Sequence, residues 1–305
     1  MIKLTKKKKW SIFGLIAIFL AIFAFLFWQR KNVFDDQGNG EIVIGSKNFT
    51  ESKVVMQIWT DALEKEGFSV KTKPNISSSV IYQAIKTGQI NLYPEYTGTI
   101  AATYLDKDLI GKNASQVAEI AAKGMQKNNL TVLNYAPGND AQGLVIRADV
   151  AKKYGIKNIS DLQKNAEKIR FVSQGEFDKR EDGVPGLEKT YGKFNFKSHK
   201  VYDQSLKYEI LANNEGDLIP ASTTEGQLAT GKYLVLNDNK HFWPAYNLVP
   251  LISNQTLQKY PKVREILDKI DKKLTTQELR TLNKRVDVDG ENYQTVARDW
   301  VQKNL

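Results

Sequence analysis

The chain has 305 residues, with 44 lysines and arginines against 34 aspartates and glutamates, and no cysteine. Its length leaves room for two α/β units of ordinary domain size, and the lack of cysteine excludes disulfides, thiolate chemistry and a lipid-modified cysteine anchor. Seven basic residues and no acid fall within residues 1–31, so the rest of the chain has 37 basic and 34 acidic residues, a net charge of only +3. That excess is too small for a nucleic-acid-binding protein.

The N-terminal segment predicts one membrane-spanning helix. Residues 10–28 form an uncharged apolar run of 19 residues, which is long enough to cross a bilayer. Five lysines lie in residues 1–9, so the positive-inside rule places this basic segment in the cytoplasm and everything after the run outside. A cleaved secretory signal is the alternative, but the run ends in Phe-Leu-Phe-Trp-Gln-Arg without a small-residue cleavage site. We therefore expect a single-pass anchor in the cell membrane, a tether at residues 29–40 and an extracellular binding domain.

From residue 41 onward, short apolar strands alternate with helices. Strands are predicted at residues 41–45, 69–73, 90–93, 131–134, 143–146, 170–173, 199–202, 217–220 and 233–236, and helices at about 48–66, 77–86, 114–128 and from about 261 to the end.

The strands at 143–146 and 233–236 flank one α/β block and connect it to a second block built from both ends of the sequence. We therefore expect lobe 2 at residues 139–236, and lobe 1 at residues 41–138 and 237–305. Two chain crossovers between two lobes are typical of binding proteins, although α/β enzymes share the same strand–helix alternation.

Four segments carry a family resemblance: Gly45–Glu51 (GSKNFTE), Tyr93–Thr99 (YPEYTGT), Phe177–Gly183 (FDKREDG) and Phe242–Asn247 (FWPAYN). Together they resemble the solute-binding proteins of osmoprotectant ABC importers, which take glycine betaine, carnitine or choline. The resemblance implies a two-lobed α/β fold of the type II periplasmic-binding-protein class, whose lobes close on the solute. It also implies an ABC permease as partner and, through the permease, an ATPase.

The resemblance also assigns roles to individual residues. Tyr96 and Tyr246 match two positions of the family's aromatic cage, and Thr99 matches a ligand-contacting position beside them. Two further cage positions fall on Gln142 and Ser222, where relatives often carry tyrosine. An amide and a hydroxyl there weaken cation–π capture and add hydrogen-bonding capacity. We therefore expect a quaternary-ammonium solute with additional polar groups, such as carnitine or a histidine-derived betaine like ergothioneine.

Two polar positions leave their roles open. Asn48 either caps the helix that follows it or contacts the ligand. Arg180 belongs either to a solvated charge cluster or, because of its place in FDKREDG, to the cleft between the lobes. We carry both residues forward as candidate ligand contacts.

Signatures of catalysis are absent from the sequence. It has no phosphate-binding loop, no dinucleotide fingerprint and no G-x-S-x-G elbow, and its two histidines lack the spacing of metal ligands. We predict no catalytic residue, no metal and no cofactor. Two alternatives to transport remain: a membrane-tethered solute sensor and an exported α/β enzyme.

Overall fold

The computed structural model describes residues 41–109 and 111–305 of the chain. The transmembrane helix predicted at residues 10–28 lies outside these ranges. Within them, none of the helices combines the length and the apolar character that a membrane span requires.

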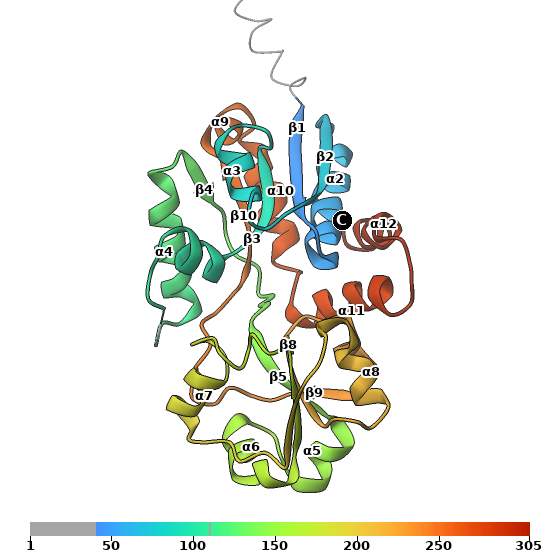
Figure 1. The fold of residues 1–305 in the computed structure, drawn as a ribbon. Helices are drawn as coiled ribbons and strands as arrows, with labels where there is room; N and C mark the ends of the chain where they lie inside the picture. The colour runs from blue at the N-terminus through green and yellow to red at the C-terminus, as the bar shows by residue number, and fades with distance from the viewer. Residues whose placement is uncertain (1–40, 110) are drawn as a thin grey trace, which may run out of the picture.

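Two five-stranded sheets form the cores of two lobes, as predicted (Figure 1). The sheet of lobe 1 has the order β2-β1-β3-β10-β4 and that of lobe 2 has the order β7-β6-β8-β5-β9. In lobe 1 the strands are β1 (Ile42–Lys47), β2 (Val70–Ile76), β3 (Leu92–Tyr96), β4 (Leu130–Val132) and β10 (Leu248–Ser253). In lobe 2 they are β5 (Gln142–Arg147), β6 (Arg170–Ser173), β7 (Ser198–Val201), β8 (Leu218–Ser222) and β9 (Tyr233–Val235).

The two sheets share one topology. Three strands are parallel in each (β2, β1 and β3; β7, β6 and β8), and the fourth in order runs antiparallel to its neighbours. That antiparallel strand, β10 in lobe 1 and β5 in lobe 2, is the one the chain forms first after crossing from the other lobe. Each crossover therefore leads into the strand next to the centre of a sheet. The crossovers lie between the two sheets, and so does the cleft.

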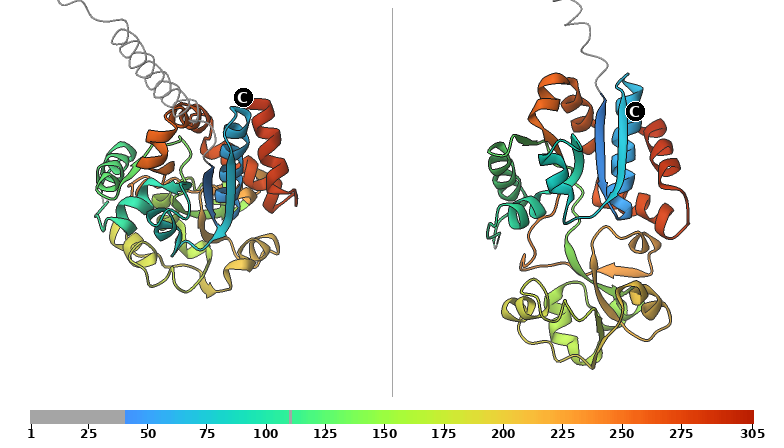
Figure 2. Two further views of the ribbon diagram at one scale, coloured as in Figure 1. Left: turned by 90° about the horizontal axis from the view of Figure 1, so that it is seen from above. Right: turned by 45° about the horizontal axis from the view of Figure 1, so that its top comes forward.

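Helices cover both faces of each sheet, and the buried residues divide into clusters accordingly. In Figure 2, α4 (green) and α12 (red) lie on opposite flanks of lobe 1. The helices of lobe 1 are α2 (Thr50–Lys65), α3 (Ile81–Lys86), the π-helix η1 (Thr99–Tyr104), α4 (Ala114–Gln126), α9 (Asn254–Lys259), α10 (Lys262–Asp271), α11 (Thr276–Asp287) and α12 (Tyr293–Asn304). Those of lobe 2 are α5 (Ala148–Tyr154), α6 (Ile159–Asn165), α7 (Val184–Tyr191) and α8 (Lys207–Ala212), with the short turns η2 (Ala166–Lys168), η3 (Gln204–Leu206) and η4 (Gly226–Thr230).

The two crossovers run side by side as an antiparallel pair. Asn139 of the first and Asn247 of the second form an isolated bridge, and the Asp140 N–H donates to the carbonyl of Tyr246 at 3.0 Å. These bonds hold the two connections together at the point where the lobes meet (Figure 1). Side chains next to these two crossovers can therefore contact residues of both lobes.

A third contact joins the lobes away from the crossovers. The loop after β8 packs on α11 of lobe 1, where the Asn283 side-chain N–H donates to the Thr224 carbonyl at 2.9 Å. At Gly226 a Cβ atom would lie only 2.6 Å from the backbone nitrogen of Lys284. Because only glycine allows this approach, α11 acts as a second support for lobe 2.

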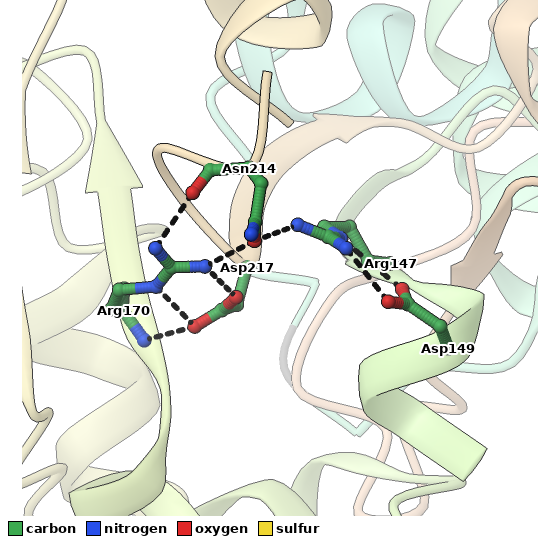
Figure 3. A network of polar contacts seen from close by, with 5 residues as sticks. All are labelled: Arg147, Asp149, Arg170, Asn214 and Asp217. Carbon is green, nitrogen blue, oxygen red and sulfur yellow. Dashed lines mark hydrogen bonds and ion pairs between the residues drawn. The ribbon is translucent and has the colours of Figure 1, made fainter. Parts of the chain in front are cut away.

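A polar network lies at the end of lobe 2 that is away from the cleft (Figure 3). Arg170 forms a bidentate pair with Asp217, at 2.9 and 2.6 Å, and Asn214 Oδ1 accepts from both Arg147 and Arg170. Burial acts to raise the pKa of Asp217, but hydrogen bonds from Arg170 outweigh it and hold this pKa below its usual range. Since β5 starts at the crossover and ends at Arg147, this network lies away from the cleft and stabilises the lobe itself.

Candidate functional site

A cavity of about 390 Å³ opens where the lobes and the crossovers meet. It is lined by the start of α2, the first crossover, the end of β8 and one side of α11. The lining residues are Asn48, Phe49, Thr50, Glu51, Lys53, Asp140, Ser222, Thr224, Glu225, Asn283 and Asp287. A larger hollow of about 490 Å³ is lined by residues 265–273 at the end of α10 alone, so it is a groove on one helical segment rather than an interlobe site.

Glu51 is buried in the wall of this cavity, with only 3% of its surface exposed. Its Oε1 accepts from the Tyr96 hydroxyl at 2.7 Å and its Oε2 from the Asn283 amide at 3.0 Å. Burial, followed by the charge of Asp140, raises the pKa of Glu51 to about 8. The carboxyl group is therefore largely neutral at pH 7 in the empty cavity.

Asp140 and Glu225 add two more carboxylates to the cavity, on the side across from Glu51. Burial raises the pKa of Asp140, although its Oδ1 accepts from the Thr224 hydroxyl at 2.8 Å. Glu225 accepts from the Ser222 backbone N–H at 2.8 Å and pairs with Lys207 at 2.6 Å. The cavity is therefore rich in carboxyl groups, and a cation is the ligand charge that would favour their ionised forms.

Tyr96 lies beside the cavity rather than open to it. Only 4% of its surface is exposed, its ring stacks on Phe49 with 6.3 Å between ring centroids, and its hydroxyl is bound to Glu51. The Lys47 ammonium lies 5.3 Å from the ring centroid. Thr99 follows at the start of η1 and is half-buried.

Tyr246 lies next to Tyr96 through the pairing of β3 with β10. Tyr96 is opposite Leu248 in that ladder, which brings the ring of Tyr246 over Gly98. A Cβ atom at Gly98 would lie 2.7 Å from Tyr246 Cδ1, so the glycine of the YPEYTGT motif makes room for the second predicted cage ring. The structure thus places the Tyr246 ring against Gly98 and the Tyr96 ring on Phe49, at the same end of two paired strands.

Arg180 approaches Tyr246 from lobe 2. It is exposed and pairs with Asp182, with Nε to Oδ1 at 2.7 Å, while Trp243 Nε1 donates to the Asp182 carbonyl at 2.9 Å. The charges of Asp182 and Arg180 act in opposite directions on the pKa of Tyr246, which burial raises. Arg180 is therefore part of the interlobe region but not of the cavity wall.

Gln142 and Ser222 face each other across the β5–β8 ladder. Residues directly opposite in an antiparallel pair point to the same side of the sheet, so the amide and the hydroxyl form one polar position. Ser222 lines the cavity. The two residues that the resemblance places at cage positions therefore lie side by side at the crossover end of lobe 2.

Asn48 also lines the cavity, and its side chain is exposed. The capping alternative for Asn48 is wrong: Phe49 occupies the N-cap position of α2, and α2 has no side-chain cap. An uncapped helix start beside a cavity leaves backbone N–H groups available to an acceptor.

Sequence reasoning missed the acidic centre of the site. Glu51 belongs to the GSKNFTE motif but was not singled out, and Asp140 and Asn283 lie outside the four motifs. Asn283 is 232 positions from Glu51, and only the fold brings them into contact. The one signal in the sequence that could have identified this centre is that Glu51 is a carboxylate in a motif at the start of a helix.

Comparisons with known proteins agree with this geometry. Residues 40–303 match the family described as the substrate binding domain of ABC-type glycine betaine transport systems. The glycine-betaine-binding protein of Pseudomonas aeruginosa is 29% identical over 273 residues, which cover 86% of this chain and 87% of that protein. A crystal structure described as a glycine betaine/carnitine/choline ABC transporter superimposes with a TM-score of 0.82 at 25% identity, covering 86% of this chain and 98% of the other.

A second relative is longer. The ergothioneine transport permease/ergothioneine binding protein EgtU of Helicobacter pylori is 28% identical over 303 residues, which cover 98% of this chain but 54% of that protein. The chain thus spans about half the length of that relative. The family match covers most of the chain, and the chain therefore belongs to the family of substrate-binding domains of ABC-type glycine betaine transport systems.

Proposed function

We propose that this chain captures a quaternary-ammonium solute of the betaine type between its lobes and delivers it to an ABC permease, which an ATPase drives. Members of its family are solute-binding domains rather than enzymes. The observation that carries the proposal is the interlobe cavity lined by four carboxyl groups, one of which, Glu51, is hydrogen-bonded to the Tyr96 ring behind it. A quaternary ammonium has no N–H to donate, so carboxylates and ring faces are the groups that hold it.

The proposed ligand contacts are the residues that the sequence singled out, together with the acidic centre. Lobe 1 supplies Tyr96, Thr99, Tyr246 and Asn48, and lobe 2 and its boundary supply Gln142, Ser222 and Arg180. Closure of the lobes needs contacts from both sides, because the closed state is favoured only by ligand bound to both lobes.

Thermal unfolding of the full chain with glycine betaine, carnitine and choline tests the proposal. A ligand present at about 100 times its Kd stabilises the folded state by about 2.7 kcal/mol, which raises Tm by several degrees. Tyr96→Ala and Tyr246→Ala should abolish the shift, whereas Tyr154→Ala, at the end of α5 and far from the crossovers, should leave it unchanged. A shift that persists in both site variants would refute the aromatic assignment.

A larger polar betaine is the second candidate, and it is favoured by the paired Gln142 and Ser222. These side chains can hydrogen-bond to groups that a bare trimethylammonium lacks. The relative from Helicobacter pylori is named for ergothioneine. Calorimetric titration with ergothioneine in competition with glycine betaine decides between them, and glycine betaine binding far more tightly than every larger betaine would exclude the second candidate.

We further propose that residues 10–28 anchor the protein in the cell membrane with the binding domain outside. The uncharged run and the preceding lysines support this. Protease added to intact cells should remove the binding domain, and recovery of a soluble secreted form without residues 10–28 would favour the cleaved signal instead. A tethered sensor would bind the same solutes, but deleting it would leave uptake of labelled solute unchanged.

A further inference from the structure

Among the carboxyl groups that line the cavity, Glu51 alone is buried. Within the described residues it forms no ion pair, whereas Glu225 pairs with Lys207. The two hydrogen bonds of Glu51 come from a phenol, Tyr96, and an amide, Asn283. In the described part of the chain, no lysine, arginine or histidine forms an ion pair with it. A buried carboxylate held only by neutral donors is poorly stabilised in its charged form.

The charged and titratable groups around Glu51 come from six parts of the fold. By element they are Lys47 of β1, Lys53 of α2, Tyr96 of β3, Asp140 of the first crossover, Glu225 after β8 and Asp287 of α11.

The lysines in this set are engaged elsewhere. Lys47 pairs with the fully buried Glu95, and the Lys53 ammonium lies 5.9 Å from the ring centroid of Tyr293. Asp287 accepts from the Thr50 hydroxyl at 2.5 Å. The positive charge that Glu51 lacks is therefore not supplied by these neighbours, and a ligand in the cavity is placed to supply it.

Asn283 gives an independent indication. Its side chain is 4% exposed, and its Oδ1 has no hydrogen-bond partner while its Nδ2 donates to both Glu51 and Thr224. An orphaned acceptor in the wall of a cavity is rare in folded proteins. Since Asn283 lines the cavity, this acceptor is left for a donor that enters it, such as water or a polar group of the solute.

We propose that Glu51 is a proton-exchanging subsite for the cationic end of the solute, neutral in the empty protein and ionised in the complex. This inference rests on the proposed function. On binding, the O–H bond of the Glu51 carboxyl breaks, the proton leaves to solvent, and the carboxylate faces the fixed positive charge of the ligand. No other bond changes.

The sign of the resulting pH dependence follows from the charges. The ligand's positive charge favours the carboxylate and lowers the pKa of Glu51 in the complex, below its value of about 8 in the empty protein. Below that pH, binding must expel a proton. The affinity therefore falls by about tenfold for each unit that the pH drops while the empty site is neutral and the complex ionised, and it levels off above about pH 8.

Isothermal titration calorimetry of the full chain in detergent tests the proposal. Choline and glycine betaine are the probes, because neither changes its own protonation near neutral pH. Repeating each titration in buffers of different ionisation enthalpy gives the number of protons released. At pH 7 we expect close to one proton per ligand, and binding about tenfold weaker at pH 6.

Two variants locate the proton. Glu51→Gln should release no proton and should bind with little pH dependence, because glutamine mimics only the neutral carboxyl. Glu119→Gln removes an exposed carboxylate of α4 outside the cavity and should behave as the wild type. If Glu51→Gln does not fold, Asp140→Asn makes the same distinction, since proton release that persists in this variant does not come from Asp140 and release that disappears does not come from Glu51.

The outcomes separate this inference from the proposed function. Binding of either probe without proton exchange between pH 6 and pH 8 overturns the proton-exchanging subsite and leaves the proposed function standing. Proton release that persists in a folded Glu51→Gln protein also overturns it, since the proton then belongs to another group such as Asp140. Failure of every betaine-type solute to bind at any pH overturns the proposed function itself.

Discussion

Replacing Gly98 with alanine tests whether the position of the Tyr246 ring matters for binding. Gly98 has φ −64° and ψ −43°, a conformation open to any residue, so the added methyl causes no backbone strain. It would instead lie 2.7 Å from Tyr246 Cδ1 and 2.8 Å from the Ala245 carbonyl oxygen. Carbon atoms in contact are about 3.5–4.0 Å apart, so the ring must retreat by about 1 Å.

The size of the effect follows from this overlap. Overpacking of this kind destabilises a protein by about 1–3 kcal/mol. If the displaced ring also loses its contact with the solute, the affinity should fall at least tenfold, since tenfold corresponds to about 1.4 kcal/mol. Calorimetric titration gives the affinity, and urea unfolding of the same sample gives the stability.

A second glycine provides the matched control. In Gly124→Ala the new methyl would lie 2.2 Å from Leu105 Cδ1, which overpacks α4 on the flank of lobe 1. This variant should lose stability but keep its affinity. In a Tyr246→Ala background, Gly98→Ala meets only the Ala245 carbonyl oxygen, so any further loss of affinity there measures the backbone contact and not the ring. Gly98→Ala with wild-type affinity and reduced stability would refute the role of the ring.

Three further substitutions test the energetics of the fold. Lys47→Met leaves the fully buried Glu95 without its cation and should destabilise the protein by about 3–5 kcal/mol in urea unfolding. Asp271→Asn removes a carboxyl whose pKa burial raises well above its usual value. Wild-type stability falls as the pH rises from about 4 through that pKa, so the variant should be the more stable protein at pH 7, with the gain vanishing near pH 4 in thermal unfolding. Asp217 has a lowered pKa and stabilises the fold only above it, so Asp217→Asn should weaken the Arg170 network by about 1–3 kcal/mol at pH 7 and by progressively less in acid.

Alternation of apolar strands and helices predicted an α/β protein, and the two connecting segments together with the four family motifs predicted the two-lobed architecture. The strands predicted at the centres of the sheets are mostly apolar, as parallel strands with both faces covered require. Residues 170–173 were predicted and found as β6, and the helix predicted at about 48–66 is α2, Thr50–Lys65. Burial of its apolar side, rather than a side-chain cap, stabilises this helix.

One strand escaped prediction, β10, although it lies near the centre of the lobe 1 sheet. Its sequence, Leu248–Ser253, contains Pro250, and proline is uncommon in inner strands because it cannot donate to the ladder. In the structure Pro250 lies directly opposite Pro94 of β3, so the two missing donors fall at one paired position. A rule that considers one strand at a time cannot anticipate such compensation.

The candidate site, like the fold, could be predicted from the sequence only in part. Its aromatic candidates lie in short motifs, so Tyr96 and Tyr246 could be named from the sequence, and the motif glycine makes room for the Tyr246 ring. The acidic centre depends on burial and on contacts between segments far apart in the chain, as Glu51 and Asn283 are. Sequence identifies a carboxylate, but only the fold decides that it is buried and without a cation.

Glu51 bears on the two positions, Gln142 and Ser222, where the resemblance leads us to expect cage rings. A ring face attracts a desolvated cation by about 0.5–2 kcal/mol, so Gln142 and Ser222 together forgo at most about 4 kcal/mol. One ionised carboxylate about 4 Å from the ligand charge contributes about 4 kcal/mol at an effective dielectric constant near 20. In the proposed subsite, an ionised Glu51 at that distance would therefore contribute as much as both rings. Exchanging rings for a carboxylate keeps the preference for a cation and makes capture depend on pH, which a purely aromatic cage does not.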